Sequence, residues 1–578
     1  MILNVNKTKL LLVSILAAIV IVAVVVGLVI GLRSRESSPH VRLTGGAVTS
    51  NGAECAEIGA NILRRNGSAV DAAIATLFCE GITCPQSMGL GGGFLATLYF
   101  RDTNKAEAMI AREIAPAAAT RDMYVNSSSI SGGLAVAVPG ELKGYWELHQ
   151  RYGRLEWHTL VEPTIELCRK GHLVTGYLAR ILAGRTERIR NEPSLREVFL
   201  NPDTQEPWKE GDFLKRPKLA ETLEIIAKEG AAAIYSPNGT LLPLLMKDLK
   251  QFGSIITEDD FYNYKPRWVA PVHTSIRKTS QVYSIPLAGS GTILTYMLNI
   301  LDSFGKLTMG DPLTWHRIVE SFKHGYGLRT RVGDPAFVPG IETELQKLTS
   351  KTYAQFISET IADDSTHSDF GHYGALFSTE NDQGTAHVSI LAPDGDAVAV
   401  TSTINNILGA MIRSTSTGIV LNDEMDDFST PGVINSYGLP ASPANYIAPG
   451  KVPMSSMTPT IVTDEHGDVR IVVGSAGGSR ITTATLQMIV RNLIFGETLE
   501  TIINTPRMHH QLAPMSVEYE AGFDPAVIDG LVKRGHVCKE SPSDGGFAAL
   551  TAIVRYADNR IEATWDPRRS GSTAILQD

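Results

Sequence analysis

Residues 381–405 read NDQGTAHVSILAPDGDAVAVTSTIN and carry the clearest structural pattern in this chain of 578 residues. Residues 385–391 alternate in polarity as a half-buried strand does, and residues 397–404 form a second strand-like run. The segment Ala392-Pro393-Asp394-Gly395-Asp396 between them has the residues of a type I turn that ends in a glycine bulge. We therefore predict a hairpin in which Ala392 pairs with Asp396.

The turn type decides which residues of the hairpin face each other. Continuing the register from the Ala392–Asp396 pair places Thr385 opposite Thr403 and Gln383 opposite Asn405. A two-residue loop would shift the register by one and place Thr403 on the other face. Threonine pairs across strands are common, so the pair alone does not establish a function.

Thr385 begins its strand directly after Gly384, at the end of a polar loop. If the Gly384–Thr385 bond were cut, Thr385 would carry a free α-amine beside its own hydroxyl. An α-amine has a pKa of about 8, so near neutral pH it can accept the proton of that hydroxyl. Thr403 could then fix the Thr385 side chain by a hydrogen bond. The pattern fits a nucleophile and a base in one residue.

Composition excludes several classes of protein. Hydrophobic residues make up 43% and charged residues 20%, which is globular rather than disordered usage. A net charge of −9 leaves no broad basic surface, so we expect no nucleic-acid partner. Five cysteines are too few for a disulfide scaffold.

The N-terminal residues differ in composition from the rest of the chain. Residues 10–32 contain no charged side chain and would form about 35 Å of helix, enough to cross a bilayer core of about 30 Å. The run is longer than the apolar part of a signal peptide and ends at Arg33-Ser34-Arg35 without a small-residue cleavage site. We predict an uncleaved signal anchor at residues 10–32, preceded by a cytosolic tail of residues 1–9.

The body that follows is expected to be extracellular, which makes a single-pass type II protein of the plasma membrane. The flanking charges decide the orientation of the span poorly. Only nine residues precede the span and more than 540 follow it, so we expect the larger part outside the cell. Asparagines 66, 126 and 238 each stand in an Asn-x-Ser/Thr triplet, which suits a glycosylated surface.

Coarse patterns along the body predict alternating helices and strands. Expected helices are residues 49–63, 68–79, 145–152, 219–230 and 481–495, and residues 94–100 are an expected strand. The glycine-rich run 87–93 demands positive φ or close backbone approach, and no Walker motif follows it. Residues 472–474 end a strand, and residues 475–479 form a glycine turn before the last of these helices.

Motifs spread along the body resemble those of the γ-glutamyltransferases, a family of N-terminal-nucleophile hydrolases. In chain order the motifs are Ser68–Asp71, the 87–93 glycine run, REIAP at 112–116, VPGE at 138–141, GTAHVS at 384–389, TSTIN at 401–405, NDEMDDF at 422–428, PMSSMTPT at 453–460 and GSAGGSR at 474–480. The resemblance implies an α+β fold, a four-layer αββα sandwich preceded by one transmembrane helix. It also implies self-cleavage at Gly384–Thr385 into a large subunit (33–384) and a small catalytic subunit (385–578), which together form one domain.

The family's activity would be extracellular γ-glutamyl transfer and glutathione hydrolysis. Thr385 would take the γ-glutamyl group from glutathione or a related γ-glutamyl compound, and would pass it to water, an amino acid or a dipeptide. No cofactor is implied, and the partners are these substrates, the two cleaved subunits of the chain itself and the membrane.

The resemblance also implies roles for residues whose chemistry suits a γ-glutamyl donor. Thr385 and Thr403 are the expected catalytic pair, and backbone N–H groups at Gly477 and Gly478 would form the oxyanion hole. A substrate carboxylate would meet Arg112, Ser455 and Ser456, and a substrate ammonium would meet Asn405, Glu424 and Asp427.

Plainer interpretations of these residues remain open without the family. Arg112 could form an ordinary ion pair with Glu113 or another carboxylate, and the 423–427 acidic run could be a solvated loop. That run lacks the oxygen spacing of a calcium loop, and the neighbouring His509 and His510 do not face one way. We therefore predict no metal ligands among them.

Several features depart from the family's pattern or vary within it. Asn406 and Ile407 follow Asn405 where many animal members carry an aromatic residue. Cys55 and Cys79 match one disulfide of animal members, whereas the other three cysteines are left over. The segment 442–451 is short, with no room for the lid of many bacterial members, which predicts an open cleft.

Two other functions remain for the same residues. The chain could be an unprocessed or inactive membrane-anchored homologue that serves as a surface or binding protein. It could also be an acylase of the same superfamily that acts on other amides, in which case Arg112 and the two serines would not recognise a glutamyl group.

Overall fold

The computed structural model describes residues 45–378, 384–542 and 547–576, which belong to one structural unit. The predicted cytosolic tail and signal anchor, residues 1–9 and 10–32, lie outside the described residues. Within the described ranges no helix is both long and apolar enough to span a membrane.

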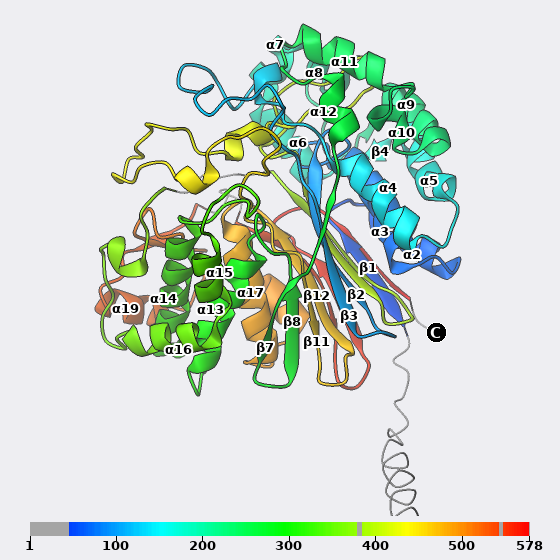
Figure 1. The fold of residues 1–578 in the computed structure, drawn as a ribbon. Helices are drawn as coiled ribbons and strands as arrows, with labels where there is room; N and C mark the ends of the chain where they lie inside the picture. Colours follow the sequence, from blue (N-terminus) through cyan, green and yellow to red (C-terminus); the bar gives the residue numbers. More distant parts are fainter. Residues whose placement is uncertain (1–44, 379–383, 543–546, 577–578) are drawn as a thin grey trace, which may run out of the picture. The chain divides into compact units, whose positions relative to one another are not determined.

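Two large antiparallel sheets form the centre of this unit (Figure 1). The first has the strand order β18 (Ser572–Leu576), β1 (Gly46–Ser50), β9 (Ala386–Leu391), β10 (Ala397–Thr403), β2 (Gly93–Phe100), β3 (Lys105–Ala111) and β6 (Arg267–Val269). The second has the order β17 (Ile561–Trp565), β16 (Ala549–Arg555), β12 (Val469–Ala476), β11 (Thr460–Thr463), β8 (Ser280–Ser284) and β7 (Val272–Ile276). Two small sheets join β13 (Met508–His509), β14 (Val517–Tyr519) and β15 (Cys538–Glu540), and β4 (His172–Leu173) with β5 (Phe213–Leu214).

The two large sheets pack face to face through a buried apolar layer. Ala47, Leu391 and Ala399 of the first sheet meet Val472 and Ile553 of the second. Because both faces of each sheet are covered, β9 and β10 are buried along their whole length. The inner layer therefore fixes β9 against β12, the strand that precedes the glycine turn.

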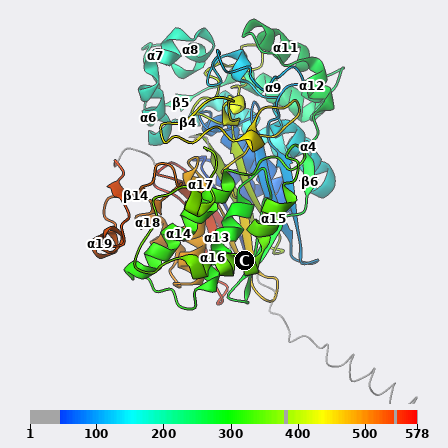
Figure 2. The same ribbon diagram turned by 60° about the vertical axis from the view of Figure 1, so that its left-hand side comes forward.

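Helices cover the outer face of each sheet, so the unit has four layers (Figure 1, Figure 2). The first sheet carries α2 (Cys55–Arg64), α3 (Ala69–Thr83), α4 (Glu141–Tyr152), α5 (Trp157–Lys170), α9 (Pro217–Glu229), α10 (Ala232–Tyr235), α11 (Leu242–Gln251) and α12 (Glu258–Asn263) in its core cluster. The second carries α13 (Gly291–Ser303), α14 (Pro312–Arg329), α15 (Glu342–Thr349), α16 (Lys351–Thr360), α17 (Arg480–Leu493), α18 (Leu499–Asn504) and α19 (Pro525–Lys533). A smaller cluster holds α6 (Gly176–Gly184), α7 (Thr186–Asn191) and α8 (Pro193–Phe199). This α+β layering agrees with the predicted sandwich.

The predicted hairpin is confirmed in its register. The Ala392 N–H donates to the Asp396 carbonyl at 2.9 Å, and Gly395 has φ 91° at the bulge position. The ladder pairs Leu391 with Ala397 and Ala386 with Ser402. Continuing it by one residue brings Thr385 and Thr403 opposite each other, as the turn chemistry predicts.

The helix expected at residues 49–63 is partly wrong, because its first residues belong to a strand. β1 covers Gly46–Ser50, and the helix begins only at Cys55. Thr49 pairs with Ser389 on one side and with Thr573 on the other. A threonine between two strands gains more from ladder hydrogen bonds than from a helix. Its partners lie hundreds of residues away, so local periodicity could not reveal them.

Other expected segments are confirmed with small shifts at their ends. Helix α3 starts after Ser68, which forms a capping box with Asp71. The strand expected to end at residue 474 continues to Ala476, so the glycine turn is shorter than predicted. Cys55 and Cys79 form a disulfide that joins α2 to α3, and Cys84, Cys168 and Cys538 are free thiols.

Candidate active site

The ends of four neighbouring strands meet at one edge of the first sheet. Thr385 directly precedes β9, and Thr403 is the last residue of β10. Thr403 pairs with Gly93 at the start of β2, and the adjacent Phe94 pairs with Ala111 at the end of β3. Antiparallel connection thus brings the predicted catalytic pair and the residue after Ala111, Arg112, to the same edge.

Two hydroxyl groups converge on the carbonyl group of Gly384. The Thr403 hydroxyl donates to this carbonyl oxygen at 2.6 Å, and the Thr385 hydroxyl also contacts it. The Gly384 N–H donates to the Asn405 carbonyl at 2.8 Å, which holds the segment against the end of β10. Arg569 donates to the Thr385 carbonyl at 2.6 Å. The carbonyl on one side of the Gly384–Thr385 bond is therefore hydrogen-bonded, and the Thr385 hydroxyl lies beside it.

The glycine run allows backbone segments to approach closely at this edge. A Cβ on Gly92 would lie 2.1 Å from the Thr403 carbonyl oxygen, and one on Gly93 would lie 2.8 Å from the Cα of Arg112. No side chain fits at these distances. The run therefore serves close approach, one of the two roles predicted for it, and brings Arg112 beside the hairpin end.

Arg112 is buried in a cluster of acidic side chains. Its guanidinium forms ion pairs with Glu424 and Asp427, which share one turn of a 3₁₀ helix, Glu424–Asp427. The same nitrogen lies 3.5 Å from the Met454 carbonyl oxygen, directly before Ser455. Arg112 therefore links the acidic turn to the serine pair. The ion pair suggested as the plainer interpretation exists, but it is buried rather than on the surface.

Burial controls the charge of this acidic cluster. It raises the pKa of Glu113 to about 8, although the Arg112 guanidinium opposes the shift. Burial likewise raises the pKa of Glu424 well above its usual range, again against the pull of Arg112. Burial therefore favours the neutral form of Glu113 and Glu424 in this cluster.

Asn405 is held at the hairpin end with φ 70°, the left-handed region that asparagine tolerates. Its N–H donates to the Thr403 hydroxyl at 2.9 Å, and its side-chain amide donates to the Asp423 carbonyl at 3.1 Å. Asp423 accepts from both the backbone and the side-chain N–H groups of Asn406 at 2.8 Å. The acidic turn and the hairpin end are thus joined by direct hydrogen bonds.

Ser455 and Ser456 lie on the segment that enters β11. The Ser455 hydroxyl accepts from the Met457 N–H at 3.2 Å, and the Ser456 hydroxyl accepts from Arg329 at 3.2 Å. Asn445 joins this segment to the acidic turn, because its amide donates to the Asp427 carbonyl and its oxygen accepts from the Met454 N–H. The structure therefore brings both predicted substrate-binding sets together around Arg112.

The glycine turn follows β12, which packs on β9. Ser389 donates to the Val472 carbonyl at 3.3 Å, and a Cβ on Gly474 would overlap the His387 ring. Residue numbers fall along β9 as they rise along β12 between these two contacts, so the C-terminal end of β12 lies toward the N-terminal end of β9. Gly477 follows β12, with φ 140°, and Gly478 has φ 61°. The predicted oxyanion turn therefore lies at the Thr385 end of β9, at the N-terminus of α17.

The site residues are buried in the uncleaved chain, which differs from the open cleft predicted from the short 442–451 segment. Thr385 is 1% exposed, and Arg112, Glu424 and Ser455 are equally covered. The Gly384 backbone itself covers the Thr385 hydroxyl, as the hydrogen bonds above describe. Access to this hydroxyl would require Gly384 to move.

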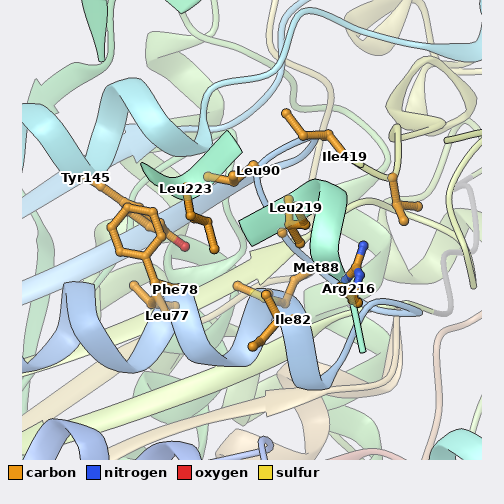
Figure 3. Close-up of a pocket in the computed structure, with 13 residues that line it drawn as sticks. Leu77, Phe78, Ile82, Met88, Leu90, Tyr145, Arg216, Leu219, Leu223 and Ile419 are labelled. Atoms are coloured by element: carbon orange, nitrogen blue, oxygen red, sulfur yellow. The ribbon is translucent and has the colours of Figure 1, made fainter. Parts of the chain in front are cut away.

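An enclosed apolar cavity lies behind the glycine run but contains none of the predicted site residues (Figure 3). Its lining includes Phe78, Met88, Tyr145, Leu219 and the buried Arg216. Only about 20 Å³ is open to water-sized molecules, room for one or two of them. This cavity is too small for a peptide substrate, so it is not the candidate active site.

Three supporting residues were missed in the sequence. Arg569 holds the Thr385 carbonyl, Arg329 holds the Ser456 hydroxyl, and Asn445 joins the two binding segments. Arg569 and Arg329 act across 184 and 127 positions, whereas Asn445 acts across 18 and 9, and none of the three lies in a motif. His509 instead bonds Thr483 at 2.8 Å and Gln511 at 3.0 Å, and the metal-compatible group found among the described residues does not include it.

Comparison with known proteins identifies the family. The gamma-glutamyltranspeptidase model matches residues 55–576. The chain belongs to the gamma-glutamyltranspeptidase family. Among its relatives, Scoloptoxin SSD14 of Scolopendra dehaani is 42% identical over 94% of this chain and 95% of its own length. Glutathione hydrolase 5 proenzyme of Rattus norvegicus is 37% identical over 92% of each chain.

The solved structures agree on the fold of this gamma-glutamyltranspeptidase. Cephalosporin acylase from Bacillus halodurans superposes with a TM-score of 0.79 and 22% identity, over 93% of this chain and 98% of its own. The described unit thus shares the α+β fold of this acylase. The family assignment makes the chain an enzyme and disfavours the predicted alternative of a binding protein.

One prediction concerns Glu141, whose buried carboxyl group lies beside Ser402 of β10. Glu141 accepts hydrogen bonds from Ser402, at 2.8 and 2.9 Å, and from Tyr145, and burial raises its pKa to about 8. A group with a raised folded pKa stabilises the protein fully below its unfolded value of 4.5, and this contribution is lost as the pH rises through about 8. Glu141→Gln keeps the neutral form at every pH. We expect the free energy of unfolding of this variant to fall less steeply between pH 4.5 and about 8 than that of the background. The two slopes should differ by up to about 1.4 kcal/mol per pH unit.

Urea unfolding of the uncleaved chain, with Thr385→Ala as background, measures this effect. Glu147→Gln on the same helix is the control, since that carboxylate is partly exposed beside Lys143 at 3.6 Å. Parallel pH profiles for Glu141→Gln and the unmodified background would show that Glu141 is ionised and would contradict the prediction.

Proposed function

We propose that this chain cleaves itself at Gly384–Thr385 and then acts through Thr385 as a γ-glutamyltransferase and glutathione hydrolase. The observation that carries the proposal is the convergence of the Thr385 and Thr403 hydroxyls on the Gly384 carbonyl, at the edge of the sheet that also holds Arg112. This arrangement supplies a nucleophile and a hydrogen-bond donor at one peptide bond.

Self-cleavage would begin with attack of the Thr385 oxygen on the Gly384 carbonyl carbon. Negative charge develops on the carbonyl oxygen, and the Thr403 hydroxyl at 2.6 Å stabilises it. The C–N bond breaks as the nitrogen takes a proton, which leaves Gly384 joined to Thr385 as an ester. Water then hydrolyses the ester and frees both the Thr385 hydroxyl and its α-amine.

Turnover would use these two freed groups. The α-amine, with an ordinary pKa of about 8, takes the proton of the hydroxyl as the oxygen attacks the γ-carbonyl of the substrate. The N–H groups of Gly477 and Gly478, at the positive end of α17, stabilise the tetrahedral intermediate. The leaving amine takes the proton, and Thr385 retains the γ-glutamyl group as an ester. Water or an acceptor amine then releases it.

Recognition of the glutamyl group would depend on the Arg112 cluster. The substrate carboxylate would bind the Arg112 guanidinium with the hydroxyls of Ser455 and Ser456. The substrate ammonium would bind Glu424, Asp427 and the Asn405 side chain. Because burial raises the pKa of Glu424, a bound ammonium group would favour its ionised form. A substrate that carries both charges therefore suits the cluster better than a neutral amide does.

The names of relatives support glutathione as a substrate. The rat relative is named a glutathione hydrolase proenzyme, and it matches 92% of this chain. Its name also agrees with a precursor that is processed before it acts.

We further propose a single-pass type II arrangement in the plasma membrane, with the catalytic body outside the cell. The apolar run at residues 10–32 supports an anchor. The disulfide between Cys55 and Cys79 suits an oxidising compartment. Asn66, Asn126 and Asn238 are all exposed, so each could be glycosylated. A glycosidase-induced mass shift of the expressed protein tests this arrangement, and its absence would contradict it.

Assay of the purified body on glutathione, with and without a dipeptide acceptor, tests the proposed activity. We expect release of glutamate without the acceptor and formation of a γ-glutamyl dipeptide with it. Thr385→Ala is the matched control and should form neither product. A full-length, uncleaved protein without either activity would instead indicate an inactive homologue.

A further prediction isolates the role of Thr403. Thr403→Val removes the hydroxyl but keeps the shape of the side chain, so we expect self-cleavage to slow about 10²–10³-fold, as for loss of one oxyanion donor. Thr403→Ser should retain most of the rate. The time course of full-length protein on a denaturing gel measures this, and equal rates for Val and Thr would contradict the role.

A further inference from the structure

A buried group of metal-compatible side chains lies away from the active site, between α14 and α19. His316 and Glu320 stand one turn apart on α14, and His536 follows α19. One donor atom from each lies within 4.8 Å of the other two, and all three side chains are buried. Helices α14 and α19 pack side by side (Figure 1).

The distances between the donor atoms suit a small tetrahedral ion. His316 Nδ1 lies 2.8 Å from His536 Nε2, and His536 Nε2 lies 3.8 Å from a Glu320 carboxylate oxygen. Ligand atoms at about 2.0–2.1 Å from zinc in a tetrahedral site are about 3.3 Å apart. Each of these two pairs would therefore need to change by about half an ångström. The third pair, His316 and Glu320, lies within 4.8 Å.

Further contacts orient these donors as metal ligands are oriented. His316 Nε2 lies 2.8 Å from the Ala362 carbonyl, so this nitrogen carries the proton and Nδ1 accepts a hydrogen bond from His536 Nε2, which would give up its proton on binding a metal ion. The other Glu320 oxygen accepts from the Tyr373 hydroxyl at 2.9 Å. Such outer contacts fix the tautomer and angle of ligands in known sites.

We propose that His316, Glu320 and His536 bind one divalent transition-metal ion, with zinc the best match. Two imidazoles and one carboxylate are ligands that zinc accepts, whereas calcium and magnesium prefer oxygen atoms alone. The site would be structural, because it lies apart from the Thr385 edge.

The Lys323 ammonium would compete with a metal ion for the Glu320 carboxylate. The ammonium lies 3.2 Å from the Glu320 oxygen and also donates to Thr366 at 2.5 Å and to the His367 carbonyl at 2.8 Å. A bound ion would therefore take the carboxylate from Lys323 and would face its charge. Removal of this charge should strengthen metal binding.

The ion would join two parts of the chain that the proposed cleavage separates. His316 and Glu320 precede residue 384, whereas His536 follows it. The Thr366 N–H also donates to the Arg534 carbonyl at 2.9 Å, so the same two parts already touch here. This consequence rests on the proposed cleavage, but metal binding itself does not. The site is complete in the uncleaved chain.

Titration of the metal-free body with zinc chloride, followed by calorimetry and metal analysis, tests the proposal. We expect one zinc ion per chain, both in the cleaved protein and in the uncleaved Thr385→Ala variant. His536→Gln and Glu320→Gln should each weaken binding at least about tenfold. Lys323→Met should tighten it. His372→Gln is the matched control, since its exposed ring stacks on His367 at 3.7 Å and should leave binding unchanged.

A folding check keeps these variants interpretable. Each must retain the wild-type circular dichroism spectrum and the wild-type extent of cleavage. No zinc binding by the wild-type body, or the same affinity after His536→Gln, would overturn the proposal. In the cleaved protein, zinc should also slow urea-induced separation of the two chains, and His536→Gln should remove that effect. Failure of cleavage would remove only this last measurement and would leave the zinc titration intact.

Discussion

Thr385→Ala is expected to leave the chain at full length and to reduce γ-glutamyl transfer by at least about 10⁴-fold. Alanine lacks the oxygen that would attack Gly384, and it lacks the nucleophile for turnover. The wild-type hydroxyl lies against the Gly384 carbonyl, so its removal eliminates the reacting atom rather than a distant support. A denaturing gel and a γ-glutamyl anilide assay on the same preparation measure both effects.

Two controls separate chemistry from folding in this experiment. The substitution removes only one hydroxyl and one methyl group, so the alanine variant should still unfold cooperatively, within several degrees of the wild-type temperature. Thr385→Ser keeps the hydroxyl and, after cleavage, the α-amine, and should therefore retain both cleavage and transfer at lower rates. Cleavage of the alanine variant at the same bond, or undiminished turnover, would show that another residue supplies the nucleophile.

Arg112→Gln should give the second-largest effect, a loss of about 10²–10³-fold in kcat/KM for a γ-glutamyl anilide. Removal of one partner from a buried, hydrogen-bonded charge pair costs about 2–5 kcal/mol, and each 1.4 kcal/mol corresponds to a tenfold change. Arg112 contacts both Glu424 and Asp427, so the loss also disturbs the acidic turn. Glutamine keeps some hydrogen bonding in place of the guanidinium.

Substrate analogues distinguish loss of recognition from general damage to the site. A 4-aminobutyryl anilide lacks the α-carboxylate, and the wild-type enzyme should prefer the glutamyl compound to it strongly. In Arg112→Gln this preference should nearly vanish. Asp427→Asn should instead reduce discrimination against a glutaryl anilide, which lacks the α-ammonium. If Arg112→Gln weakened both substrates equally, Arg112 would support the fold and would not bind the carboxylate.

Local chemistry made the hairpin and its consequences predictable. The turn at residues 392–396 determines the register by itself, so the facing positions of Thr385 and Thr403 followed without any tertiary information. The apolar run at residues 68–79 likewise predicted α3, whose start is fixed by the Ser68–Asp71 capping box in the structure. The acidic run at residues 423–427 could have been a solvated loop, and only the family resemblance gave Glu424 and Asp427 a role. The resemblance to γ-glutamyltransferases added roles that spacing alone could not supply.

Features made by distant segments were not predictable in this way. Thr49 belongs to a strand only because β9 and β18 flank it, and both lie more than 300 residues later. Arg569 reaches the Thr385 carbonyl from near the C-terminus. His536 joins His316 across 220 positions, so no spacing rule marks the three metal-compatible residues. The burial of Thr385 and Arg112 also depends on the whole fold, so the short length of segment 442–451 did not predict it.

Mass spectrometry of the active protein tests the central claim most directly. The enzyme would be mixed with a γ-glutamyl anilide, quenched in acid and separated under denaturing conditions. The proposed mechanism predicts a chain that begins at Thr385, with one γ-glutamyl group attached to that residue. An intact Gly384–Thr385 bond in protein that turns over substrate would contradict it.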